Sequence, residues 1–129
     1  MTQEDKELLL KDLCARLPYG VCYKHFTWDD ERGEECIAAK IYSINSDGYV
    51  KNCYDDETVY IDNVRPYLFP LSSMTEEQKK EYQYITERWM NDPVYSISDS
   101  IDWLNKNHFD FRNLIDKNLA IDCTSLNIY

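Results

Sequence analysis

The chain has 129 residues, 43% hydrophobic and 14% aromatic, so it can bury a core and is not a disordered acidic chain. Its 24 acidic and 14 basic side chains give a net charge of −10, which disfavours binding to duplex nucleic acid. Neither a signal peptide nor a membrane span is indicated, and the five cysteines are scattered, so we expect a cytoplasmic protein with free thiols.

The order of the sequence patterns predicts a single domain of the α+β class over 1–129. We expect 1–70 to form an N-terminal helix and a small antiparallel sheet, and 71–129 to form a helical half docked on that sheet. For the sheet we predict an SH3-like or partly open barrel, with a small curled sheet as the alternative.

The first predicted element is an amphipathic helix over 2–17. Leucines and Cys14 recur on one stripe, and Thr2 can accept a hydrogen bond from an early helical amide. Pro18 and Gly20 are expected to end this helix.

Four strands are predicted next. They are VCYKHFTW (Val21 to Trp28), CIAAKIYSI (Cys36 to Ile44), YVKNCY (Tyr49 to Tyr54) and ETVYIDNV (Glu57 to Val64). Asp47-Gly48 can form a tight turn, so the second and third strands should pair antiparallel.

A proline-stiffened connector is predicted between the two halves. Pro66 and Pro70 favour an extended backbone, so we expect 65–71 to cross the surface of the protein. Thr75 and Gln78 have the spacing of a capping box, which predicts a helix that begins at Glu76.

The C-terminal half is predicted to be helical. In the helix from Glu76, an apolar stripe is expected to cover one face of the sheet, and 91–93 should end the helix; the stripe consists of Tyr82, Ile85, Trp89 and Met90. A helix over 99–107, capped by Ser98 or Ser100, should bury Ile101 and Leu104. A third is expected over 111–117, capped by Asp110 and closed by a left-handed Asn118. We expect 119–129 to dock back as an extended tail.

Three blocks carry a resemblance to a known group of proteins. They are KDLCARLPYGV (Lys11 to Val21), RPYLFPLSSMTEEQ (Arg65 to Gln78) and DWLNKNHFDFRNLIDKNLAIDCTSLNIY (Asp102 to Tyr129). Together they resemble a family of small acidic proteins encoded by phages, prophages and conjugative elements of gut anaerobic bacteria. The resemblance implies a mobile-element accessory protein in a bacterial cytoplasm, and it supplies no catalytic residue or cofactor.

A zinc site is the first chemical hypothesis that the sequence raises. Cys22 and His25 are three residues apart, and Cys36 and Cys53 follow in later strands. Because residues i and i+3 of a strand point to opposite faces, we favour ordinary thiols over metal ligands. We predict no metal site and no cofactor.

Catalytic signals are equally sparse. His108 beside Asp110 could serve a thiol nucleophile, but no cysteine lies in a nucleophile motif, and His108 is better explained as a helix C-terminal residue. The acidic run Asp55-Asp56-Glu57 lacks the pattern of a calcium loop, so we interpret it as a solvated loop. With no glycine-rich phosphate loop either, we predict no catalytic residue and no enzyme.

Aromatic side chains in the sheet region supply the candidate binding surface. We favour a non-enzymatic protein that binds a host protein through this acidic, tyrosine-rich surface. Its candidate residues are Tyr23, Trp28, Tyr42, Tyr49, Tyr54, Tyr60, Arg65 and Tyr67. The alternative is a protein that sequesters a small ligand or nucleotide between sheet and helices, held by Arg65, Arg88 or Arg112. Homo-oligomerisation through an edge strand or the tail stays open.

Overall fold

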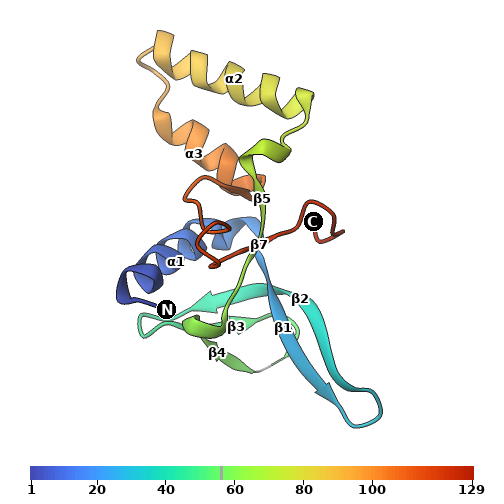
Figure 1. Cartoon of the computed structure of the whole chain (residues 1–129). Coiled ribbons are helices and arrows are strands. Elements are labelled where there is room, and N and C mark those ends of the chain that lie inside the picture. The colour runs from blue at the N-terminus through green and yellow to red at the C-terminus, as the bar shows by residue number, and fades with distance from the viewer. Residues whose placement is uncertain (56) are drawn as a thin grey trace.

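The computed structural model describes residues 1–55 and 57–129. It confirms the α+β class: an N-terminal helix, a curled four-stranded antiparallel half-barrel, and two later helices. In Figure 1 the helical pair α2–α3 lies at one end of the molecule and the half-barrel at the other, with helix α1 and the C-terminal segment between them.

Helix α1 spans Gln3–Arg16 and begins as its sequence predicts. The amide of Asp5 donates to Thr2 Oγ1 at 3.1 Å, and the amide of Thr2 donates back to the Asp5 carboxylate at 3.2 Å. A single 3₁₀ turn over Leu17–Tyr19 follows, and Gly20 leaves it with a left-handed φ of 73°. The chain therefore reverses directly into the first strand.

The half-barrel consists of β1 (Cys22–Asp29), β2 (Gly33–Ile44), β3 (Tyr49–Asn52) and β4 (Thr58–Tyr60), in that order. All three neighbouring pairs are antiparallel, and the predicted turn at Asp47-Gly48 joins β2 to β3. A register shift between Ile41 and Ser43 increases the curl of the sheet, as bulges do. β4 is shorter than predicted because Ile61–Asn63 form a 3₁₀ turn.

The predicted surface connector is the central strand of a second sheet, so that part of the interpretation is wrong. β5 (Tyr67–Pro70) lies between β6 (Phe109–Asp110) and β7 (Ile121–Asp122), and both pairs are parallel. The two prolines still leave enough backbone groups for the ladder. Pro66 accepts from the Ile121 amide at 2.8 Å, and the Phe69 amide donates to His108 at 2.8 Å.

Helices α2 (Glu76–Asn91) and α3 (Ile97–Lys106) form an antiparallel pair. The capping box of Thr75 and Gln78 is present as predicted. The cap of α3 is Ser96 rather than Ser98 or Ser100, because Ser100 is buried and accepts from the Trp89 indole at 2.8 Å. Ile101 is exposed, whereas Leu104 is buried as expected.

The apolar stripe of α2 does not cover the half-barrel. Tyr82 and Ile85 pack in a small cluster with Trp103, Leu104 and Phe109, and Met90 is exposed at the far end of the helix. An amphipathic pattern predicts that a face is buried, but it does not identify what covers that face. The main core lies instead between α1, the half-barrel, β5 and the C-terminal segment.

No third helix forms over 111–117. Asn113 adopts a left-handed φ of 59°, which interrupts a helix in the middle of the predicted range. Asp110 still caps the turn, because its carboxylate accepts from the amides of Leu114 at 3.0 Å and Ile115 at 2.9 Å. Asn118 is left-handed as predicted, and the tail docks through β7 and the buried Cys123.

Candidate functional site

One face of the β1–β2 hairpin carries large exposed aromatic rings. Strand periodicity sends alternate residues of β1 to this face, and their directly opposite partners on β2 share it. We define the outer sheet surface as Lys24, Phe26, Trp28, Glu34, Lys40, Tyr42 and Tyr54. Trp28 is 73% exposed, Tyr42 69% and Tyr54 66%, so these rings are free to contact a partner.

Tyr54 belongs to this surface because it borders the same hollow as Tyr42. The hollow has a volume of about 400 Å³ and is also lined by Asn52, Cys53 and Asp55. At the opposite end of the surface, Asp29 ends β1, the turn of the β1–β2 hairpin holds Asp30 and Glu31, and Glu34 and Glu35 follow on β2. The outer sheet surface thus combines aromatic rings with an acidic tip.

The remaining candidate surface residues lie elsewhere. Tyr23 and Tyr67 are buried, so they cannot contact a partner. Tyr49 is exposed and packs its ring 5.2 Å from that of the half-buried Tyr60. The guanidinium of Arg65 donates to the carbonyls of Asp62 at 3.0 Å and Val64 at 2.9 Å. Arg65 therefore closes a backbone turn.

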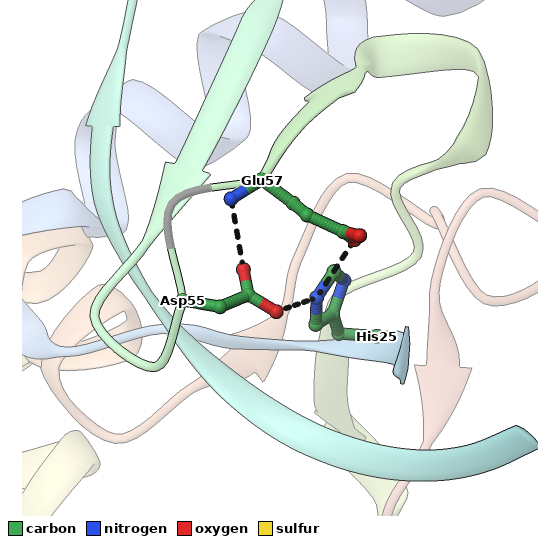
Figure 2. A group of neighbouring side chains, drawn as sticks. All are labelled: His25, Asp55 and Glu57. Carbon is green, nitrogen blue, oxygen red and sulfur yellow. Dashed lines mark hydrogen bonds and ion pairs between the residues drawn. The ribbon is translucent and has the colours of Figure 1, made fainter. Parts of the chain in front are cut away.

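A polar cluster lies beneath the outer sheet surface, where His25 of β1 meets the segment that follows β3 (Figure 2). His25 Nε2 lies 2.9 Å from Asp55 Oδ2 and 3.7 Å from Glu57 Oε2. His25 is buried, Asp55 is half-buried and Glu57 is exposed. Asp56, the middle residue of the predicted acidic loop, lies outside the described residues.

The hydrogen bonds around this cluster assign the tautomer of His25. Asn52 Oδ1 accepts from the amides of Tyr54 and Asp55, both at 2.8 Å, so its Nδ2 must be the donor to the Tyr23 hydroxyl at 2.9 Å. That hydroxyl then has one hydrogen left to donate, and His25 Nδ1 lies 3.2 Å away. Nδ1 is therefore the acceptor, and Nε2 carries the hydrogen that is donated to Asp55.

The same hydrogen bonds shift the titration of Asp55. Partial burial raises the pKa of its carboxyl, but hydrogen bonds from His25, the Glu57 amide and Asn52 outweigh burial, and the net pKa lies below the ordinary value. Asp55 is therefore ionised at neutral pH and holds the segment after β3 against β1.

His25, Asp55 and Glu57 are the group in the described part of the chain that could hold a metal ion, since their ligand atoms lie within 4.8 Å of one another. The hydrogen-bond directions do not favour it. Binding a metal through Nε2 would move the His25 hydrogen to Nδ1 and leave the buried Tyr23 hydroxyl without an acceptor. We interpret the cluster as a structural clamp.

The cysteines do not complete a metal site. Within residues 1–55 and 57–129, Cys22, Cys36 and Cys53 do not gather with His25, so the residues considered for zinc do not converge. Burial raises the pKa of the Cys22 thiol and raises that of Cys123 to about 11, which keeps both protonated. These two thiols are poor nucleophiles as well as poor ligands.

His108 and Asp110 do not form a catalytic pair. The Asp110 carboxylate faces backbone amides, and the His108 ring stacks on Tyr129 with ring centroids 3.6 Å apart. Burial and the nearby Arg16 lower the pKa of His108 to about 4. His108 lies beyond the end of α3 with a left-handed φ of 62°, so a neutral buried ring replaces the expected helix-terminal cation.

A buried ionic network is the main feature that the sequence interpretation missed. Asp12 and Arg16, both fully buried in α1, are joined at 2.8 Å, and Arg112 reaches the other oxygen of Asp12 at 2.7 Å. Arg16 also donates to the Phe109 carbonyl at 2.5 Å. The i, i+4 spacing of Asp12 and Arg16 was visible in the sequence, but it resembled an exposed helix pair. This network joins α1 to β6 and the turn that follows.

The three arginines proposed to hold a small ligand point to different neighbours. Arg65 bonds to a backbone turn, Arg112 pairs with Asp12, and Arg88 lies over the Tyr95 ring. A separate cavity of about 220 Å³ does lie between β5, β6 and the start of α2. It is lined by Phe69, Ser73, Thr75, Gln78, Phe109 and Thr124, and the capping box occupies two of its polar groups. Ligand pockets usually exceed about 300 Å³, so this cavity and these separated arginines favour the small-ligand alternative less than the binding of a protein.

Comparison with known proteins identifies no relative: none of the family models, curated proteins or solved structures that were compared with this chain matches it. In the part of the chain that the structure describes, the helices are too short or too polar to span a bilayer.

Proposed function

We propose that this protein is a non-enzymatic binding protein whose outer sheet surface contacts a protein partner. The exposure of Trp28, together with that of Tyr42 and Tyr54, is the observation that carries the proposal. Tryptophan and tyrosine contribute disproportionately to the free energy of protein association, and exposing them to water is unfavourable unless they have a partner.

The charges on the hairpin define the kind of partner. Five carboxylates lie at 29–35 with Arg32 as the one cation of that segment, and Lys24 lies 5.4 Å from the centre of the Phe26 ring. A partner with an apolar patch bordered by lysine or arginine would match this arrangement, and opposite charges would speed their association. A polyanion would be repelled.

The family resemblance supplies the setting of the proposal. An accessory protein of a phage or conjugative element acts inside its host, so we propose a host protein as the partner and the bacterial cytoplasm as the location. The buried His25 clamp supports this function indirectly, because it fixes the segment that carries Tyr54.

The proposal is tested by affinity capture from bacterial lysate, followed by measurement of the dissociation constant for the captured protein. We expect Trp28→Ala to weaken binding by about 30-fold, the usual effect of removing a dominant interface side chain. The control is Leu71→Ala, which removes an exposed apolar side chain that lies outside the outer sheet surface. Capture of no protein above background, or equal binding by the Trp28→Ala variant, would contradict the proposal.

A further inference from the structure

The end of the α2–α3 pair exposes apolar side chains that nothing in the described chain covers. Val94 is 83% exposed, Met90 67% and Ile97 58%; Met90 lies at the end of α2, Val94 in the connection and Ile97 at the start of α3. In Figure 1 this end projects away from the half-barrel. A turn between two helices is usually polar, so this apolar composition is unfavourable for an end that is always in water.

An arginine without an acceptor lies at the same end. The Arg88 guanidinium is 4.2 Å from the centre of the Tyr95 ring and 5.6 Å from that of Tyr84. Its Nε atom is buried and has no hydrogen-bond acceptor, and among the described residues the side chain takes part in no ion pair. Burying a donor without an acceptor is unfavourable, and the positive charge of this guanidinium has no carboxylate partner among the described residues.

A shallow hollow gives access to this arginine. Its volume is about 260 Å³, and it is lined by Tyr84, Glu87, Arg88, Asn91 and Asp92. Glu87 accepts from the Gln83 side chain at 2.9 Å, and Asp92 accepts from the Val94 amide at 3.0 Å. These two carboxylates therefore have other donors, but their charge still lies close enough to repel a polyanion.

We propose that this end of α2–α3 is a second docking surface, which binds a polypeptide that presents one carboxylate side chain beside apolar residues. The carboxylate would pair with the Arg88 guanidinium, and the neighbouring apolar side chains would cover Val94 and Tyr95. A single carboxylate fits the charges of the site, whereas a nucleic acid or a phosphorylated ligand would face Glu87 and Asp92. A second copy of the chain fits less well, since each copy carries a net charge of −10.

This proposal does not depend on the outer sheet surface, because the two surfaces lie at opposite ends of the molecule. The test uses a library of random peptides displayed on phage and selected against the whole protein. We expect enriched peptides to carry Asp or Glu next to apolar residues. Arg88→Met should weaken the binding of a synthetic enriched peptide by about 30-fold, and changing the peptide's carboxylate to the amide should have a similar effect.

Two controls separate the outcomes. Lys80→Met removes the same charge from an exposed position of α2 and should leave peptide binding unchanged, as should Trp28→Ala. If Arg88→Met does not fold, Arg88→Lys keeps the charge, loses the planar fork and should weaken binding by about tenfold. The proposal is overturned if no peptide is enriched, if enriched peptides lack a carboxylate, or if they bind both Arg88 variants as well as wild type. It is also overturned if the protein forms a dimer in solution that Val94→Asp abolishes, because a second copy of the chain would then cover this end.

Discussion

His25 donates its Nε2 hydrogen to Asp55 across 2.9 Å and thereby joins β1 to the segment after β3. Asn52 and Tyr23 determine this direction, because their hydrogen bonds leave His25 Nδ1 as an acceptor. The four residues form a network in which each buried polar group has a partner, and such networks are stabilising when complete. The cluster is therefore a clamp below the proposed binding surface.

The first prediction concerns the charge of Asp55. Its folded-state pKa lies below the ordinary value, so the carboxylate stabilises the fold above the unfolded-state pKa and loses that effect as pH falls through the folded-state pKa. Asp55→Asn should lower the free energy of unfolding by about 1–2 kcal/mol at neutral pH, and by less below about pH 4. Urea denaturation across pH measures this. Asp47→Asn, in an exposed turn, is the control. If Asp55→Asn lowers the free energy of unfolding by the same amount at every pH, the lowered pKa of Asp55 is contradicted.

The second prediction concerns zinc. Because metal binding would orphan the Tyr23 hydroxyl, excess zinc chloride should change the melting temperature of the wild-type protein by less than about 1 °C. Differential scanning fluorimetry with and without zinc measures this. A concentration-dependent rise that disappears in the Glu57→Gln variant would show instead that the cluster binds metal.

The third prediction concerns the buried Asp12. Asp12→Ala removes the carboxylate that pairs with both Arg16 and Arg112, and a buried charge without its ionic partner costs about 3–5 kcal/mol of stability. Guanidinium denaturation measures the loss. Glu76→Ala breaks only the exposed pair with Lys79 and should cost less than about 1 kcal/mol. If both variants lose the same small amount, the network is not a structural support.

The fourth prediction concerns His108. Its folded-state pKa is about 4, below the ordinary value of 6.5, so the unfolded chain binds more protons between these values. Stability should fall by about 2 kcal/mol from this group alone as pH drops from about 7 to about 5. His108→Asn keeps a residue that tolerates positive φ and should flatten that dependence. An unchanged pH profile in the variant would show that His108 titrates normally.

Local signals were readable from the sequence, and contacts between distant segments were not. The N-cap at Thr2, the capping box at Thr75 and the turn at Asp47-Gly48 each depend on residues within a few positions, so their prediction was confirmed. β5 was missed because its partners Phe109 and Ile121 come much later in two-residue strands. Such short partners have no periodicity of their own.

The candidate site shows the same division. Trp28 was correctly expected in a strand, because Val21 to Trp28 is rich in β-branched and aromatic residues. The prediction of one surface for Tyr23 and Trp28 was wrong, because residues five apart in a strand point to opposite faces and Tyr23 is buried. His25 was paired with cysteines in the sequence analysis because the spacing was suggestive. Its actual partner, Asp55, is brought to it by the curl of the sheet and by Asn52.

Site-specific photo-crosslinking tests the proposed protein-binding function most directly. The photoreactive amino acid p-benzoylphenylalanine would replace Trp28 of the outer sheet surface in one variant and Lys11, exposed on α1, in another. Irradiation in host lysate should give a discrete crosslinked protein from position 28 and none from position 11. Crosslinks of equal yield and identity from both positions, or none from position 28, would contradict the proposal that this surface binds a protein.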